Sequence, residues 1–313
     1  MAYRVIIGML TYNLEKYVAE AIESVLSQNV NFDFKLLISD DSSSDNTRNI
    51  LKRYQSKYPD KIELILAVNN AGCSANALRL YEKFDSEYFA ILDGDDIWLN
   101  PDKLQKQVDF LDEHKECTMC SGQTYYIVDG KIAGHIIPEE WLGKYYTYDD
   151  FFKRPLLLHV SGLLYRNVVF SKGIPYPFYE TLNTFEDCAI RGEDFRRVLH
   201  LEHGSAYIMP EIVSGYRIHN QGLWSGMSNT RKMIESAIFD DYVAKYYRYM
   251  PFNKYKMIKD KAEQSYRELM EYLINNKILY PNCRLAPKEL ELFSGYLMNQ
   301  VKNNNISFIM DRI

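Results

Sequence analysis

Short apolar runs alternate with helical patterns over the first third of this chain, and this order constrains the fold more than any other feature of the sequence. Strand-like and helical segments follow one another over residues 4–10, 14–28, 34–39, 47–58, 62–68, 75–84 and 88–92. The strand-like runs are apolar, and the helical segments repeat apolar residues at intervals of three and four. Strands joined by helices pair in parallel, with helices on both faces of the sheet. We therefore expect an α/β fold with a mostly parallel sheet.

The pattern changes further along the chain. Residues 103–114 are helical, residues 117–128 are strand-like, and Asp129-Gly130 predicts a hairpin turn. Helical segments rich in Tyr and Lys then occupy residues 233–249, 255–275 and 287–303. A chain of 313 residues is long enough for two domains. We predict one domain over residues 1–228 and a C-terminal helical subdomain over residues 229–313.

Net charge, apolar stretches and cysteine spacing limit the kinds of function and location that we expect for this protein. A net charge of -5 gives no general attraction to nucleic acid. The sequence has neither a signal-peptide pattern nor an apolar stretch long enough to span a bilayer, so we expect a cytoplasmic protein. The five cysteines are irregularly spaced. Cys117 and Cys120 have no second pair and no histidine at zinc-ligand spacing, which favours reduced thiols over structural zinc.

Three carboxylates stand within four residues directly after the apolar run 88–92. The sequence there is Asp93-Gly94-Asp95-Asp96. Like charges this close repel unless a positive group lies among them, and carboxylate oxygens are the ligands that hard divalent cations prefer. The alternative is an acidic turn before a helix. Because ligands of open α/β sheets bind beyond the carboxyl ends of strands, a metal ion is the functional interpretation.

A second acidic cluster follows the second predicted strand, at Asp40-Asp41-Ser42-Ser43-Ser44-Asp45. Parallel strands end at the same edge of a sheet, so the two clusters predict one shared site. The residues from Ser42 to Asp45 have an alternative role as helix N-caps. A carboxylate at Asp40 or Asp41 could accept a hydrogen bond from the imide N–H of uracil, which would select uridine or thymidine over cytidine, because cytidine lacks that donor.

Taken together, the ordered motifs over residues 3–225 resemble family 2 glycosyltransferases of the GT-A fold, which is Rossmann-like. The motifs are Thr11-Tyr12-Asn13, the run from Asp40 to Thr47, Asn70-Ala71-Gly72 and Asp93-Gly94-Asp95-Asp96. The resemblance implies that the first motifs hold the nucleoside and that the last binds the ribose and a diphosphate-bound metal. The nucleotide-binding residues would be Thr11, Tyr12, Asn13, Asp40, Asp41, Asn70, Asp93, Gly94 and Asp95.

The same resemblance implies a Mn²⁺ or Mg²⁺ cofactor, with Asp95, Asp96 and His219 as metal ligands. His219 belongs to the segment Tyr216-Arg217-Ile218-His219. An isolated histidine is otherwise more often a surface or core residue than a ligand. The segment that closes over the donor diphosphate would contribute Arg217, Trp224 and Ser225, and for Arg217 a salt bridge is the alternative.

The catalytic base has two candidates. An inverting transfer needs a carboxylate that takes the proton of the acceptor hydroxyl opposite the leaving diphosphate. Glu186-Asp187 and Glu193-Asp194 both fit. We favour Asp194, because its pair opens a helical run that Gly204 ends, and we keep Asp187 as the alternative.

The expected activity is metal-dependent, inverting transfer of a sugar from a nucleotide donor, most simply a UDP-sugar. The acceptor would be a hydroxyl of a glycan or lipid-linked molecule in surface polysaccharide synthesis. Two other classes stay open: a haloacid-dehalogenase-like phosphatase, which also carries an Asp-x-Asp motif, and a non-catalytic protein that binds sugar nucleotides. The basic and aromatic residues of 245–261 could bind anionic lipid at a membrane surface or a second copy of the chain, although a solvated helix face explains them too.

Overall fold

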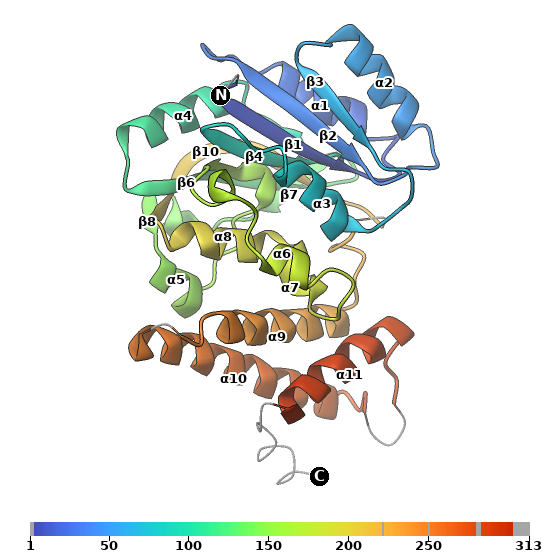
Figure 1. Cartoon of the computed structure of the whole chain (residues 1–313), viewed down its shortest axis with the longest axis vertical. Helices are drawn as coiled ribbons and strands as arrows, with labels where there is room; N and C mark the ends of the chain where they lie inside the picture. Colours follow the sequence, from blue (N-terminus) through green and yellow to red (C-terminus); the bar gives the residue numbers. More distant parts are fainter. Residues whose placement is uncertain (1–2, 221, 250, 280–282, 303–313) are drawn as a thin grey trace. The chain divides into compact units, whose positions relative to one another are not determined.

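Four parallel strands from the start of the chain form one half of a single sheet (Figure 1). They are β1 (Val5–Thr11), β2 (Phe34–Asp40), β3 (Ile62–Leu66) and β4 (Tyr88–Asp93), in the spatial order β3-β2-β1-β4. β1, β2 and β4 are almost wholly buried, as their apolar sequences require. The predicted parallel sheet is confirmed for this half.

The other half of the sheet is mixed. β9 (Leu163–Arg166) lies antiparallel between β4 and β6 (Cys117–Val128), and β10 (Ser205–Ile218) runs parallel to β6. The remaining strands pair antiparallel with β6 or β10; they are β5 (Ile97–Trp98), β7 (Lys131–His135) and β8 (Lys144–Tyr146). Asp129 and Gly130 turn the β6–β7 hairpin with φ angles of 49° and 73°, which confirms the predicted turn.

Helices cover both faces of the parallel half. α1 (Val18–Leu26), α2 (Thr47–Lys57) and α4 (Lys103–Glu113) pack on the face that carries the odd-numbered residues of β1. α3 (Cys73–Tyr81) lies on the opposite face, where it approaches Gly8 closely. A Cβ atom at Gly8 would lie 3.0 Å from Leu80 Cδ1 and 2.9 Å from Phe84 Cζ, so only glycine lets the helix pack this near.

The structure describes residues 3–220, 222–249, 251–279 and 283–302, and the chain divides into two compact units. The first unit comprises residues 1–180 and 196–220 and holds the sheet; the second comprises residues 181–195 and 221–313. The first unit also contains α5 (Tyr148–Lys153) and α6 (Pro177–Glu180), and α8 (Glu193–Leu201) crosses the division. No pattern in the sequence indicates that residues 181–195 group with the C-terminal helices, and the predicted domain boundary after residue 228 stays a prediction.

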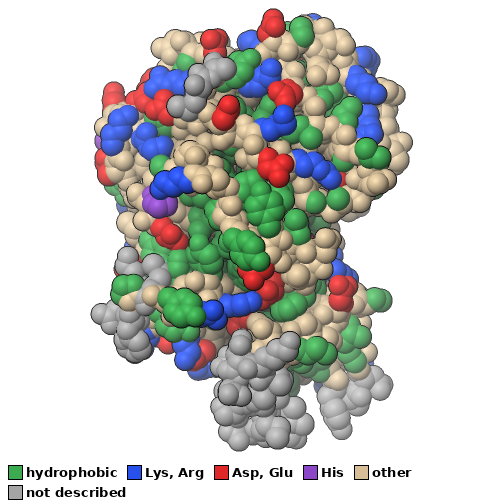
Figure 2. Space-filling model, viewed as in Figure 1, with side chains coloured by type: hydrophobic (Ala, Val, Ile, Leu, Met, Phe, Trp, Pro, Cys, Tyr) green, Lys and Arg blue, Asp and Glu red, His purple; other side chains and the backbone are tan. Residues whose placement is uncertain are grey.

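On the face of the sheet unit shown in Figure 2, acidic and basic side chains are interspersed rather than gathered by sign. The cysteines are present as thiols, in keeping with the prediction. Within the described ranges, no helix is both long and apolar enough to cross a membrane.

The second unit is helical, as predicted. Its helices are α7 (Asp187–Arg191), α9 (Asn229–Tyr246), α10 (Phe252–Asn275) and α11 (Pro287–Lys302). The last residue of the third predicted helix, Asn303, lies outside the described residues. Several basic groups of the predicted lipid-binding face have acidic partners within the unit: Lys245 with Glu186, Lys259 with Glu263, and Lys261 with Asp240. This pairing reduces the charge available to a membrane surface, and membrane or self-association stays a prediction.

Candidate functional site

The carboxyl ends of β1, β2 and β4 meet at one edge of the sheet. Thr11 pairs in register with Asp40 on one side of β1, and Leu10 pairs with Asp93 on the other. The two acidic clusters therefore follow the strands that flank β1. This is the edge at which open α/β sheets bind ligands.

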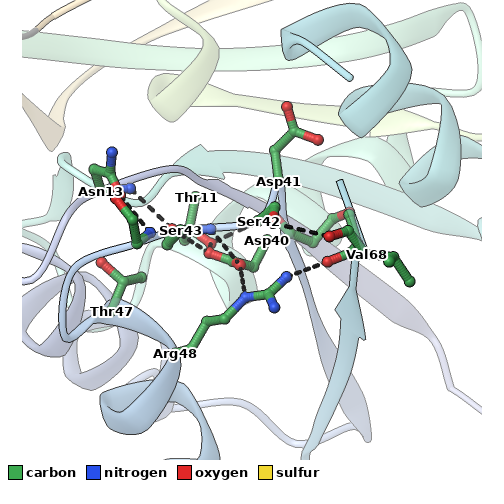
Figure 3. Close-up of polar contacts among 12 residues, drawn as sticks. Thr11, Asn13, Asp40, Asp41, Ser42, Ser43, Thr47, Arg48 and Val68 are labelled. Atoms are coloured by element: carbon green, nitrogen blue, oxygen red, sulfur yellow. Dashed lines mark hydrogen bonds and ion pairs between the residues drawn. The ribbon is translucent and has the colours of Figure 1, made fainter. Parts of the chain in front are cut away.

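Asp40 has a fully buried carboxylate whose acceptor positions are filled by the chain itself (Figure 3). Its Oδ1 accepts from Ser43 N at 3.0 Å and from Arg48 Nε at 2.5 Å. Its Oδ2 accepts from Thr11 Oγ1 at 3.2 Å and from the Ser43 hydroxyl. Arg48, near the start of α2, also donates to the Ala67 carbonyl. The arginine and the hydroxyls supply the compensation that a buried carboxylate requires.

Asp41 points away from Asp40 in Figure 3 and is also buried. Its Oδ1 accepts from Ala71 N at 3.0 Å and from Arg79 Nη1 at 3.1 Å, and its Oδ2 accepts from Gly72 N at 2.7 Å. Gly72 has a φ angle of 89°, which only glycine adopts at little cost. Asp41 thus fixes the loop that leads into α3.

The predicted contact of these two aspartates with a nucleobase stays a prediction. A carboxylate offers about four lone-pair positions; Asp40 accepts four hydrogen bonds from the chain, whereas Asp41 accepts from three donor groups. At Asp40 a uracil imide would have to replace one of the present donors. Tyr12, which is 49% exposed, and Asn70, which is exposed, have more freedom to contact a nucleoside at this edge.

The Ser- and Asp-rich run after Asp41 joins two neighbouring loops. Asn13, at a φ angle of 54°, accepts from Ser44 N at 2.8 Å and donates its own N–H to Ser43 Oγ at 2.9 Å. Leu14 N donates to Thr47 Oγ1 at 2.8 Å. The N-cap residue of α2 makes no side-chain capping hydrogen bond. Asp45 Oδ1 accepts from the N–H of Thr47, the first residue of α2, at 2.9 Å. The run therefore serves the amides of the loop before α1 and, through Asp45, the start of its own helix.

The turn 93–96 packs tightly against the end of β1. Gly94 N donates to Leu10 O at 3.0 Å. A Cβ atom at Gly94 would lie 2.7 Å from Thr11 Cγ2 and 3.0 Å from Leu10 O, so any side chain would push the turn away. The glycine between the aspartates is explained by this close approach.

Asp95 and His219 meet across the sheet edge although they are 124 residues apart. The Oδ2 atom of Asp95 lies 2.9 Å from Nε2 of His219, and both side chains are mostly buried. His219 directly follows the end of β10, which explains how it reaches the turn 93–96. The structure brings these two predicted ligands together.

Asp96 has different surroundings. It is 1% exposed; its Oδ1 accepts from Arg217 N at 3.0 Å, and its Oδ2 lies 3.7 Å from Nδ1 of His159. Burial raises the pKa of Asp96, and repulsion from Asp95 and Asp93 raises it further. Asp96 does not share the contact between Asp95 and His219, so its role as a metal ligand stays a prediction.

Asp95 and His219 fit a divalent cation that is held jointly with a diphosphate. Among the described residues, no group of three or more His, Cys, Asp or Glu side chains is arranged to hold a metal alone. One carboxylate oxygen and one imidazole nitrogen are suitable donors for Mn²⁺, and cations at phosphate sites commonly take only one or two protein ligands. Phosphate oxygens and water would complete the shell.

Arg217 forms the salt bridge that was the alternative to a phosphate contact. Its guanidinium pairs with Glu20 of α1, donates to the Asp95 carbonyl at 2.9 Å and lies 5.5 Å from the ring centre of Tyr17. The predicted contact between Arg217 and phosphate therefore stays a prediction.

The remaining predicted residues belong to the second unit. Asp187 is the first residue of α7, Asp194 is the second residue of α8, and both are half-buried. Because both acids lie in the first turn of a helix, the helix-start argument does not decide between them. Trp224 is 49% exposed with Lys232 Nζ 5.5 Å from its ring centre, and Ser225 follows it in the same turn.

Sequence reasoning missed Arg48, Arg79 and Tyr17. Adjacent carboxylates at the end of a buried strand do signal that cations must lie nearby. Which of the 37 lysines and arginines supply the charge depends on the packing of α2 and α3 against the sheet, which the sequence does not state.

Several known proteins are similar to this chain in sequence or in fold. An uncharacterized protein of Mycobacterium tuberculosis is 31% identical over 232 residues, which cover 72% of this chain and 62% of the relative, so this chain spans less than two thirds of that protein. Residues 1–349 of S. aureus TarS, in complex with UDP-GlcNAc, match with a TM-score of 0.56 at 14% identity, over 86% of this chain and 81% of that fragment. The mannosyltransferase PcManGT of Pyrobaculum calidifontis, in complex with GDP-Man and Mn²⁺, matches with a TM-score of 0.55 at 13% identity, over 96% and 87% of the two chains.

These structural matches establish the GT-A fold, in agreement with the mixed α/β sheet and its helices. The sequence model described as glycosyl transferase family 2 matches residues 6–167, the part that contains β1 to β4 and both acidic clusters. The chain belongs to glycosyl transferase family 2.

Proposed function

We propose that this glycosyltransferase uses Mn²⁺ or Mg²⁺ and moves a sugar from a UDP-sugar, with inversion, to a hydroxyl group of a glycan or lipid-linked acceptor in surface polysaccharide synthesis. The observation that carries the proposal is the approach of Asp95 and His219 to 2.9 Å beside the end of β1. The complexes of the neighbours TarS and PcManGT, with UDP-GlcNAc and with GDP-Man and Mn²⁺, support a nucleotide-sugar donor of this class.

Each residue of the edge has a proposed part. Asp95 and His219 hold the cation, which when bound neutralises charge on the departing diphosphate. Asp96 fixes the strand that carries His219 through its hydrogen bond from Arg217 N, or reaches the metal itself. The nucleoside and ribose contact a set drawn from both loops and the turn: Thr11, Tyr12, Asn13, Asp40, Asp41, Asn70, Asp93 and Gly94.

The proposed base is Asp194, with Asp187 as the alternative. Inversion requires in-line attack, so one carboxylate must accept the proton of the acceptor hydroxyl on the side opposite the diphosphate. Trp224 and Ser225, with Arg217, are the proposed segment that closes over the donor.

A panel of UDP-, GDP- and dTDP-sugars tests the donor and the metal together. A ligand that binds only the folded protein raises its unfolding temperature, and a concentration of 100 times the dissociation constant stabilises the fold by about 2.7 kcal/mol. We expect UDP-sugars to stabilise most, with Mn²⁺ required and EDTA abolishing the effect. Stabilisation without release of UDP in the presence of acceptor would favour the non-catalytic alternative. Equal stabilisation by all donors would contradict the choice of UDP.

A further inference from the structure

We infer that Tyr17 is a positioning residue for His219, that Arg217 holds Tyr17 in place, and that this pair of contacts sets the affinity of the site for its divalent cation. The inference rests on the proposed metal dependence. It concerns side chains that belong to α1 and β10 and lie outside the acidic motifs.

The ring of Tyr17 stacks on the imidazole of His219. The two ring centres are 4.7 Å apart and the planes are inclined by 29°. The same imidazole points its Nε2 toward Asp95 Oδ2 at 2.9 Å. Rotation of the imidazole about the Cβ–Cγ bond of His219 would carry Nε2 away from Asp95. The tyrosine ring, stacked against the face of the imidazole, restricts that rotation.

Arg217 fixes the position of Tyr17. Its guanidinium lies 5.5 Å from the centre of the tyrosine ring and is itself held by Glu20 and by the Asp95 carbonyl. Its side chain is 11% exposed, so these contacts largely enclose it. The guanidinium thereby ties the end of β10 to the first turn of α1 and to the turn 93–96.

The helix start provides a second, independent argument. Tyr17 is the N-cap residue of α1 and makes no side-chain capping hydrogen bond. Ser, Thr, Asp or Asn at that position would satisfy a free N–H group of the helix and stabilise it. A sequence that departs from a local preference commonly does so at a functional site. At position 17 the ring contact to His219 replaces the cap.

Residues that orient a metal ligand without contacting the metal have a strong effect on metal affinity. Loss of a hydrogen-bonding partner of a metal ligand typically weakens metal affinity by about 10- to 100-fold, and we expect the stacking contact of Tyr17 to act on His219 in the same direction. An imidazole free to rotate would have to be ordered when the cation binds, whereas a stacked imidazole is already ordered. Tyr17 therefore acts on the cation through His219 and does not contact it.

The test measures Mn²⁺ binding to the protein with UDP bound, from the electron paramagnetic resonance signal of free Mn²⁺. We expect Tyr17→Leu to weaken Mn²⁺ binding by about tenfold or more, and Tyr17→Phe, which keeps the ring, to stay within about twofold of the wild type. Phe110→Leu is the matched control, because Phe110 stacks on His114 with centres 4.2 Å apart and neither residue belongs to the proposed site.

A milder variant covers the case in which Tyr17→Leu does not fold. Glu20→Gln removes the negative charge that pairs with Arg217, and we expect it to weaken Mn²⁺ binding by about twofold to fivefold. Unfolding temperatures in EDTA report any general loss of structure.

Three results would overturn the inference. Unchanged Mn²⁺ affinity in both Tyr17→Leu and Glu20→Gln would remove the positioning role and leave the proposed function intact. Equal weakening in Phe110→Leu would show a general loosening of the fold. Absence of Mn²⁺ binding by the wild-type complex would instead overturn the proposed metal dependence, and this inference with it.

Discussion

The two acidic clusters lie at the ends of strands that flank β1, yet their surroundings differ. Asp40 and Asp41 are each paired with an arginine, and their oxygens are filled by donors from the chain. Asp95 meets His219, and burial together with neighbouring carboxylates raises the pKa of Asp96. The first cluster is electrostatically complete without a ligand, and the second is not.

The same sequence pattern, adjacent aspartates after a buried strand, can therefore have two different roles in this protein. Adjacent aspartates after a buried strand require positive charge, which an arginine or a bound cation can supply. Where helices bring arginines to the carboxylates, the cluster holds loops in place. At Asp95 the partner is His219, and a carboxylate beside an imidazole can hold a cation. We therefore expect substitution of Asp40 to lower mainly the stability of the fold and substitution of Asp95 to lower mainly the catalytic rate.

The largest effect is expected from Asp95→Asn. Loss of a metal ligand removes several kcal/mol of charge stabilisation in the transition state, so turnover should fall by about three orders of magnitude or more. The unfolding temperature should change little, because the side chain makes few contacts that asparagine cannot keep. Single-turnover transfer and thermal unfolding measure the two quantities. Asp129→Asn, in the β6–β7 turn, is the control, and near-normal turnover of Asp95→Asn would mean that the site does not hold the metal.

A third pair of carboxylates, in the second unit, extends the comparison to catalysis. A general base acts on the acceptor in the transition state, so Asp194→Asn should lower kcat by about two to four orders of magnitude while donor affinity stays nearly unchanged. Asp187→Asn should be much milder, because only one carboxylate can lie in line with the reacting carbon. Single-turnover transfer beside donor binding distinguishes the two. An inactive Asp187→Asn with an active Asp194→Asn would reverse the assignment, and two active variants would refute a carboxylate base.

The sequence predicted the parallel strands, the hairpin at Asp129 and the C-terminal helices because each rests on a local pattern of apolar residues or turn residues. It also predicted the edge where the clusters meet, since parallel strands end together. It did not predict which partner each carboxylate finds. Arg79 lies 38 residues from Asp41, and their contact depends on how α3 packs over Gly8. Nor did it predict that residues 181–195 group with the helical unit, because that grouping depends on tertiary contacts alone.

Substitution of Asp40 tests whether the first acidic cluster stabilises the fold. Asp40→Asn leaves Arg48 without its buried partner, and removal of one member of a buried ion pair costs about 3–5 kcal/mol. The double variant Asp40→Asn/Arg48→Met should recover part of that loss, because no uncompensated charge then remains. Denaturant unfolding without nucleotide or metal gives the free energies. A loss below about 1 kcal/mol in the single variant would show that the first cluster is no structural element.

The smallest effect is expected at Asp240 of the second unit. The surroundings of this carboxylate resemble neither those of Asp40 and Asp41 nor those of Asp95. It accepts from Ser265, lies 3.8 Å from Lys261 Nζ, and burial raises its pKa from 3.8 to about 6. The folded state therefore binds the proton more tightly than the unfolded state, so its stabilising contribution is fully present below about pH 3.8 and is lost as the pH rises through 6.

Across that window we expect the contribution of Asp240 to the free energy of unfolding to fall by roughly 1–3 kcal/mol. Asp240→Asn should lack this component, and Asp260→Asn, on the exposed side of α10, should retain it. Denaturant unfolding at several values between pH 4 and 7 gives the difference between variants, in which the other titrating groups cancel. A wild type and an Asp240→Asn variant with parallel pH profiles would contradict the raised pKa. Loss of the pH-dependent component in Asp240→Asn would show that a buried carboxylate with a raised pKa need not belong to a functional site. The assignment of Asp95 as a metal ligand must therefore rest on the position of His219 beside it and not on charge alone.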